Sequence, residues 1–238
     1  MQEKIQYNKR SWIVVIGNGL IGKGMSLFTY ENDILIFASG VSNSKETRSS
    51  EYTREFDLLK SFIGTDKKLV YFSTCSVLYD CIDPTQYIQH KKFMEDFISC
   101  NFKDYLIFRL PNVVGTSTNE HTSFNFFRKM ILDNLEIKVE EKTTRYFIDI
   151  EDVVESLTPI ILSKSQNSKT FNVCFNTKIG VIDFINIMAK ELEKDPRIIL
   201  LNQGCSLNID NKNFLELVDE KFRSIGPDYN YKIIKKYS

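Results

Sequence analysis

The sequence predicts an α/β protein in which a parallel sheet carries helices on both faces. Strand and helix patterns alternate as far as Gly115, and each strand is a nearly continuous apolar run, which is typical of strands buried on both faces. A glycine-rich turn at 17–22 joins the first strand to the first helix, as in a βαβ unit with right-handed connections. Beyond Gly115 the segments become more polar, so we expect a small C-terminal lobe there.

Length and composition describe one globular unit without a strong electrostatic field. The 238 residues are 42% hydrophobic and 26% charged, which is enough to bury a core. Lys plus Arg equal Asp plus Glu at 31 each, so neither nucleic acid nor an anionic membrane is an expected partner. No run of about 18 apolar residues occurs, so no transmembrane helix is expected.

The cysteines and histidines favour a chain that works in a reducing cytoplasm without a metal. Only two histidines occur, His90 and His121, and the cysteines form no C-x-x-C pair, which argues against a zinc site or a disulfide framework. The cysteines are Cys75, Cys81, Cys100, Cys174 and Cys205. The basic N-terminus before an apolar run imitates a signal peptide, but Asn18 and the glycines interrupt that run, so we interpret it as the first strand.

The glycine-rich turn has the residue order that a phosphate-binding βα turn requires. The first glycine of G-x-G-x-x-G allows a tight turn, the second lets a pyrophosphate approach the backbone, and the third lets helix pack on strand. The helix N-terminus adds free N–H groups and a partial positive charge. The turn therefore predicts a dinucleotide as ligand. The residues expected at its phosphates are Gly17, Gly19, Leu20, Ile21 and Gly22.

The elements before Gly115 follow from hydrophobic periodicity and from turn residues. The strands expected here are 12–16, 33–38, 68–74 and 105–110. The helices expected here are 20–30, 49–63 and 86–100, the last of which is opened by Pro84. The stripe of apolar residues on the second of these helices is interpreted as a core or interface face. It consists of Tyr52, Phe56, Leu59 and Phe62.

The elements beyond Gly115 build the C-terminal lobe. A polar loop at 116–123 precedes them, and the tail from residue 195 is expected to be irregular with a solvated basic end. The strands expected here are 136–140, which should be exposed, 145–150 and 170–175. The helices expected here are 124–133, 151–162, 181–192 and one near 213–222.

Small and hydroxyl residues follow the second and third strands, at the sheet edge where open α/β sheets bind ligands. Ala38, Ser39 and Gly40 end the second strand and allow close approach by a ligand or by backbone. Hydroxyl side chains end the third strand, within a turn that is suited to hold a substrate oxygen. They are Ser73, Thr74 and Ser76.

Tyr87 and Lys91 form a Tyr-x-x-x-Lys on the helix that follows these hydroxyls. The pattern is expected once by chance, and Tyr231 with Lys235 provides a second match that lacks this context. Residues four apart share a helix face, so the Lys91 ammonium can stabilise the phenolate and lower a pKa that is normally near ~10. With a hydrogen bond from Thr74 to the same substrate oxygen, these residues predict a proton-transfer site beside a hydride carrier.

Neither histidine is assigned to this proton-transfer site. His90 lies inside the Tyr-x-x-x-Lys turn and should point away from its face into solvent. His121 lies in a polar loop that could cover a substrate, and its role stays open.

Seven motifs in this order resemble the extended branch of the short-chain dehydrogenase/reductases, which contains NAD-dependent epimerases and dehydratases of nucleotide sugars. The resemblance covers roughly residues 12–220. The motifs are GNGLIG at 17–22, FASG at 37–40, STCSV at 73–77, YIQHK at 87–91, RLPNVVG at 109–115, RYFIDIEDVV at 145–154 and FNV at 171–173.

The resemblance implies a role for each candidate residue. Tyr87 would be the general acid/base, Lys91 would bind the nicotinamide ribose of NAD or NADP and polarise Tyr87, and Thr74 would be the hydroxyl of the triad. The cofactor would also touch the glycine-rich turn and the FASG residues named above. Residues at the nucleotide-diphosphate sugar would be Ser76, Asn112 and Arg145, the last of which would grip the diphosphate with its planar fork of donors.

The resemblance also implies an organisation. We expect a Rossmann-like dinucleotide-binding domain at 1–115 and a substrate-binding lobe at 116–238 that partly returns to the first domain. A homodimer would form through a four-helix bundle built from helices 49–63 and 86–100.

Departures from the family pattern shape the functional hypothesis. FASG resembles the family's fourth strand yet follows the first helix directly, so the adenosine half of the sheet should be missing. No carboxylate stands about 20 residues beyond the glycines, since Glu31 and Asp33 come too early, and the choice between NAD and NADP stays open. The family pattern can be aligned in two ways, so that either Thr74 or Cys75 holds the hydroxyl position of the triad.

The motif after the third strand also bears on the reaction. The Asp-Glu of the dehydratases is replaced by Cys75-Ser76, so dehydration ranks low. The favoured hypothesis is a 4-keto reductase for sugars of surface polysaccharides. A nucleotide-sugar epimerase and a non-catalytic nucleotide-sugar binding protein remain as alternatives.

Overall fold

The computed structural model describes residues 14–26, 33–80 and 83–238. Its centre is a five-stranded sheet in the order β1-β2-β3-β4-β9, and every neighbouring pair is parallel. The strands are β1 (Val14–Ile16), β2 (Ile34–Phe37), β3 (Lys68–Thr74), β4 (Tyr105–Leu110) and β9 (Lys169–Asn172). The predicted α/β class with a Rossmann-like parallel sheet is therefore confirmed.

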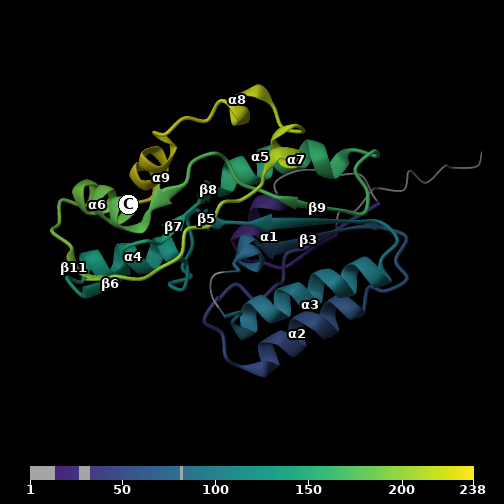
Figure 1. Cartoon of the computed structure of the whole chain (residues 1–238). Helices are drawn as coiled ribbons and strands as arrows, with labels where there is room; N and C mark the ends of the chain where they lie inside the picture. The colour runs from purple at the N-terminus through teal and green to yellow at the C-terminus, as the bar shows by residue number, and fades with distance from the viewer. Residues whose placement is uncertain (1–13, 27–32, 81–82) are drawn as a thin grey trace, which may run out of the picture.

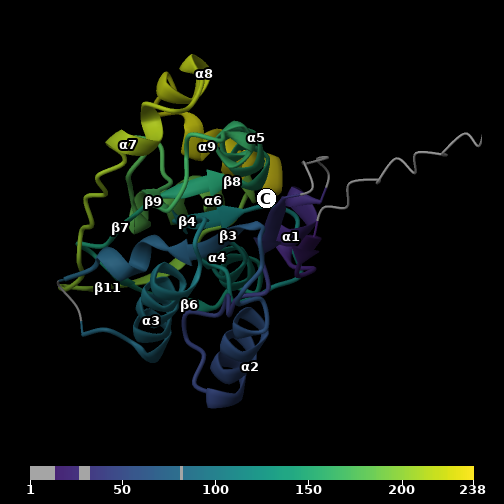
Figure 2. The same cartoon turned by 90° about the vertical axis from the view of Figure 1, so that its right-hand side faces the viewer.

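Helices cover both faces of this sheet (Figure 1). Helices α2 (Ser49–Lys60) and α3 (Gln86–Asn101) lie side by side on one face, and α1 (Leu20–Met25) and α5 (Ile150–Leu162) lie on the other. Figure 2 shows the same layers from the side. Alternate strand residues point to the two layers: Leu35 belongs to the same buried cluster as Leu59 of α2, whereas Ile36 belongs to the cluster that contains Leu157 of α5. Burial on both faces explains why β1 and β2 are apolar throughout and why β3 and β4 are largely so.

The order of strands places β1 at one edge of the sheet. β2 is its neighbour and follows α1 directly along the chain. In the described ranges no strand lies on the outer side of β1, which agrees with the predicted shortening on the adenosine side. The predicted strand 12–16 and helix 20–30 extend partly outside the described residues.

The second half of the chain adds three small sheets and also returns to the main sheet. Three two-stranded sheets lie here, with β5 paired to β8, β6 to β11 and β7 to β10. The strands are β5 (Asn112–Val114), β6 (Glu136–Glu140), β7 (Thr144–Arg145), β8 (Phe147–Asp149), β10 (Ile179–Gly180) and β11 (Arg197–Leu201). The helices are α4 (Ser123–Leu132), α6 (Val181–Glu191), α7 (Lys212–Leu215), α8 (Glu220–Arg223) and α9 (Tyr229–Tyr237). Strand β9 and helix α5 bring this half back to the central sheet.

The C-terminal tail differs from its prediction. Residues expected to be irregular form β11, which pairs with β6 in parallel. The strand predicted at 136–140 is β6 with the same bounds, but it is only half exposed, because Ile137 and Val139 are buried while the residues between and beside them are exposed. The basic end is helix α9, which buries Ile233 and Ile234, and Lys236 pairs with Asp149 at 2.8 Å. The basic side chains of Lys232, Lys235 and Lys236 are exposed as predicted, but the segment that carries them is a packed helix and not a free end.

The cysteines also differ in part from expectation. Cys205 is disulfide-bonded, so the argument against disulfides fails at this residue. Cys75, Cys100 and Cys174 are free thiols, and Cys81 lies outside the described residues. Among the described helices, none combines the length and apolar character needed to cross a membrane.

Candidate active site

The glycine-rich turn packs tightly against the end of β2. Gly17 has φ +120°, and a Cβ there would lie 2.3 Å from the Ala38 carbonyl oxygen, so a side chain has neither the conformation nor the space it needs. A Cβ on Gly22 would lie 2.3 Å from the Gly17 carbonyl oxygen. Gly19, the residue before α1, has nothing within 4 Å of its Cβ position. The turn is thus closed toward β2 and α1 and open at Gly19.

The residues after β2 lie between this turn and helix α2. The Ser39 carbonyl and hydroxyl oxygens both accept hydrogen bonds from the Arg54 guanidinium at 3.2 Å. A Cβ on Gly40 would lie 2.7 Å from Lys91 Nζ. The structure therefore brings the FASG residues to the glycine-rich turn on one side and to Lys91 on the other.

Tyr87 and Lys91 share the buried face of α3. Lys91 Nζ lies 5.9 Å from the centroid of the Tyr87 ring, and the Thr74 side chain is close enough to act on the pKa of Tyr87. Burial raises the pKa of Tyr87 above its usual value, although the Lys91 charge and the Thr74 hydrogen bond act in the opposite direction. Burial therefore outweighs the lowering of this pKa that the sequence predicted, and the Tyr87 phenol holds its proton at neutral pH.

Thr74 and Cys75 face different partners. Thr74 ends β3, with its hydroxyl close to Tyr87 while it accepts a hydrogen bond from the Ser76 amide at 3.1 Å. The Cys75 thiol donates to the Arg109 carbonyl oxygen at 3.2 Å, and burial holds its pKa well above the usual range. Of the two, Thr74 lowers the pKa of Tyr87, as a hydrogen-bonding hydroxyl would, whereas Cys75 acts to raise it.

The predicted substrate residues lie beyond this group. The Asn112 amide is held by the Tyr146 carbonyl at 3.0 Å and by the Ser123 hydroxyl at 2.9 Å. Arg145 is half-buried on β7, and its Nε is buried without a hydrogen-bond partner among the described residues. The charge of Arg145 acts on Tyr79, whose pKa is nevertheless raised by burial. Tyr79 directly follows the short turn (Cys75–Leu78) that carries Ser76, so Arg145 faces the end of β3.

His90 and a residue missed by the sequence analysis lie behind Lys91. Glu55 of α2 is completely buried, and its carboxylate contacts Lys91 Nζ at 2.8 Å and His90 Nε2 at 3.1 Å. The prediction that His90 is solvated is therefore wrong. Glu55 stands four residues before Leu59, on the stripe interpreted as apolar, and a carboxylate at that helical position was the available signal.

Loops from the two halves of the chain meet over the carboxyl edge of the sheet. Asn119 Nδ2 donates to Ser42 Oγ at 3.3 Å, and Lys45 Nζ lies 5.5 Å from the centroid of the Phe126 ring. His121 lies exposed in the same loop. Tyr87 and Lys91 are both buried.

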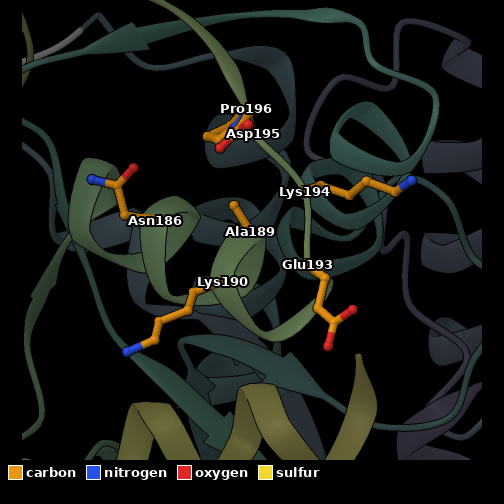
Figure 3. A pocket seen from close by; sticks show the side chains of 7 residues that line it. All are labelled: Asn186, Ala189, Lys190, Glu193, Lys194, Asp195 and Pro196. Carbon is orange, nitrogen blue, oxygen red and sulfur yellow. The ribbon is translucent and has the colours of Figure 1, made fainter.

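Two surface depressions lie apart from Tyr87. One of about 420 Å³ is formed at the C-terminal end of α6, where Figure 3 shows Lys190 and Glu193 among its lining side chains. It contains none of the predicted site residues. Another of about 380 Å³ lies at the N-terminal ends of α2 and α3 and is lined in part by Tyr52 and His90. In the described ranges no group of three or more His, Cys, Asp or Glu is placed to hold a metal ion.

Comparison with known proteins identifies the fold. No family model matches this sequence, and no curated protein matches it. Among solved structures, MoeE5 in complex with UDP-glucose and NAD is 14% identical with a TM-score of 0.69, over 86% of this chain and 78% of that chain. The chain has the Rossmann-like fold of such proteins. UDP-glucuronic acid 4-epimerase from Bacillus cereus, in complex with UDP-glucuronic acid and NAD, is 14% identical with a TM-score of 0.68, over 86% and 74% of the two chains.

A third structure covers more of both chains. RMD from Pseudomonas aeruginosa, complexed with NADPH, is 15% identical with a TM-score of 0.65 over 94% of this chain and 88% of that chain. At these identities the similarity concerns the fold.

Proposed function

We propose that this protein is an NAD(P)-dependent oxidoreductase that acts on a nucleotide-diphosphate sugar and reduces a 4-keto group. The observation that carries the proposal is the meeting of Tyr87, Lys91 and Thr74 at the carboxyl edge of the sheet, beside the glycine-rich turn. Residues 1–115 would contribute the cofactor side of the site and residues 116–238 the substrate side.

The residues present fit a dinucleotide. The open space at Gly19 would admit a pyrophosphate, with Gly17, Leu20, Ile21 and Gly22 around it. Ser39 and Gly40 would lie along the cofactor, and the Lys91 ammonium would donate to its ribose. The nicotinamide would supply the hydride.

Side chains of this protein would carry out the proton transfer. The Tyr87 phenol, which holds its proton at neutral pH, would donate it to the carbonyl oxygen of the sugar. The Thr74 hydroxyl would donate a hydrogen bond to the same oxygen, and the positive charge of Lys91 would stabilise the phenolate that remains. Burial of all three groups would keep water away from the reacting atoms.

Arg145 would bind the diphosphate. Its guanidinium faces the end of β3, and the unpartnered Nε leaves a buried donor for an anion. A planar fork of donors can engage two phosphate oxygens at once. Ser76 and Asn112 would lie beside the sugar.

Two alternatives remain. A nucleotide-sugar epimerase would use the same Tyr87, Lys91 and Thr74, and an epimerase is among the structures with this fold. A non-catalytic nucleotide-sugar binding protein is favoured by the position of β1 at the edge of the sheet, on the adenosine side.

Calorimetric titration distinguishes the oxidoreductase from the binding protein. We expect the purified chain to bind NADH or NADPH, and to bind a nucleotide diphosphate about 10-fold or more weakly when Arg145 is replaced by methionine, because a charged hydrogen bond is lost. Arg197→Met, which alters an exposed arginine of β11, is the control. Binding of nucleotide diphosphates without either dinucleotide would refute the oxidoreductase and leave the binding protein.

We also propose a homodimer through α2 and α3. Phe93 is 49% exposed and packs with Phe56 and Phe97, which gives the outer side of this helix pair an aromatic surface. Phe93→Lys should convert the dimer to a monomer in sedimentation at micromolar concentration. Leu200→Lys, at a 55% exposed residue of β11, should leave the dimer intact. A wild-type monomer would contradict the proposal.

A further inference from the structure

The Glu55 carboxylate is the most enclosed charged group next to the candidate active site. It is 0% exposed, and both of its oxygens are occupied. Oε1 accepts from Lys91 Nζ at 2.8 Å and from the Tyr71 hydroxyl at 2.7 Å. Oε2 accepts from the Val41 amide at 2.6 Å and lies 3.1 Å from His90 Nε2. Four donors, two from α3, one from β3 and one from the loop after β2, thus converge on one carboxylate of α2.

These contacts fix the Lys91 ammonium in place. Lys91 Nζ also donates to the Tyr71 hydroxyl at 3.0 Å, so Glu55, Tyr71 and Lys91 form a closed triangle of hydrogen bonds. An ammonium has three donors, and two of them are used here. The remaining donor is the one available to a ligand.

The loop after β2 closes over this group. A Cβ at Gly40 would lie 2.7 Å from Lys91 Nζ and 3.0 Å from Glu55 Oε1, so only glycine lets the backbone pass over the ion pair. The next residue, Val41, donates its amide to Glu55. The same carboxylate therefore holds both Lys91 and the loop that is expected to run along the cofactor.

The electrostatics agree with an ionised carboxylate. Burial alone would raise the pKa of Glu55, but the charge of Lys91 and the hydrogen bonds from His90, Lys91 and Tyr71 outweigh burial and hold this pKa below its ordinary value. The Glu55 charge in turn contributes to raising the pKa of Tyr71, after burial itself. A buried ion pair of this kind is strongly destabilised when one member is removed.

We propose that Glu55 is a positioning residue for Lys91, which holds the ammonium under the loop at Gly40 with one donor left for the cofactor ribose. The inference rests on the proposed function, because the ribose is the acceptor that the free donor would serve. Glu55 does not touch the reacting atoms. It acts through Lys91, and Tyr71 and Val41 complete its coordination.

Thermal unfolding of three variants tests the ion pair without any ligand. Glu55→Gln and Lys91→Met each leave one charge buried alone, and each should lower the melting temperature by about 6–20 °C. The double variant removes both charges, so its loss should be clearly smaller than the sum of the single losses. Glu51→Gln, whose carboxylate pairs with Arg54 on the same helix, is the control and should change little. Additive losses would overturn the ion pair as the source of the effect.

Dinucleotide titration, well below the melting temperature of each variant, tests the positioning role. Glu55→Gln should weaken the affinity for NADH or NADPH by about 10- to 100-fold, and it should have no further effect in the Lys91→Met background. If Glu55→Gln lowered the dinucleotide affinity equally in the wild-type and the Lys91→Met chains, the effect would be a general structural one, and the inference would be overturned. Wild-type affinity in Glu55→Gln would also overturn it while the proposed function stands. If the wild-type chain and Glu51→Gln bind no dinucleotide, the proposed function fails and the inference fails with it.

Discussion

Replacing Tyr87 with phenylalanine is expected to lower turnover by about 10²- to 10⁴-fold, because the proton donor is removed while the ring and its packing remain. Dinucleotide affinity should be unchanged, since Lys91 and the glycine-rich turn are untouched. Steady-state assays with a 4-keto nucleotide sugar and either dinucleotide measure the effect.

Tyr231→Phe is the matched control for this substitution. Tyr231 and Lys235 repeat the Tyr-x-x-x-Lys spacing on α9, but the Tyr231 side chain is exposed and lies in the C-terminal lobe. Its removal should leave turnover unchanged. Full activity of Tyr87→Phe would contradict the assignment of the acid.

The pH dependence of the wild-type reaction follows from the same residue. Burial raises the pKa of Tyr87, so the protonated phenol that reduction needs is present through neutral pH. Reduction should therefore fall only when the pH is raised through this elevated pKa, whereas oxidation, which needs the phenolate, should become faster over the same range. A rate of reduction that rises with pH would contradict the role of Tyr87 as the acid.

Replacing Gly17 with alanine is expected to lower the free energy of unfolding by about 2–5 kcal/mol. A side chain at φ +120° is strained, and its Cβ would lie 2.3 Å from the Ala38 carbonyl oxygen, which belongs to backbone that cannot rotate away. Dinucleotide binding should be lost because the turn and the end of β2 are pushed apart. Denaturant unfolding and titration give the two values.

Gly19→Ala provides the contrast, because its Cβ position has nothing within 4 Å. This variant should fold with nearly wild-type stability and yet bind the dinucleotide more weakly, since the methyl group would occupy the space through which a pyrophosphate approaches. If Gly19→Ala bound normally, the phosphates would have to lie elsewhere on the chain.

The central sheet could be predicted because its strands carry their signal locally. The runs at 68–74 and 105–110 are mostly apolar, end at hydroxyls or before a proline, and match β3 and β4 at both ends. The C-terminal tail from residue 195 carries no such local pattern. Strand β11 pairs with β6, which lies about sixty residues earlier along the chain, and its exposed Ile199 and Leu200 hide the alternation that marks a half-buried strand.

The candidate site was predictable to the extent that its residues carry motifs. Tyr87, Lys91 and Thr74 could be named from their place after β3, and the structure brings them together. Glu55 could not be named as a partner of Lys91, because the two residues belong to different helices and meet only when α2 and α3 pack on the sheet. A lone carboxylate on an amphipathic helix is normally solvated. The prediction for His90 failed because its buried partner, Glu55, lies on the other helix.

The return of β9 to the central sheet has a consequence for how the chain is made. β9 pairs with β4 and comes from residues 169–172, more than fifty residues beyond Gly115. Until then the edge of β4 is unpaired, and until residues 150–162 have formed α5 the apolar face that this helix covers is bare. A fragment that stops at residue 115 should therefore aggregate rather than fold, and on the ribosome the sheet must wait for the second half of the chain before it can close.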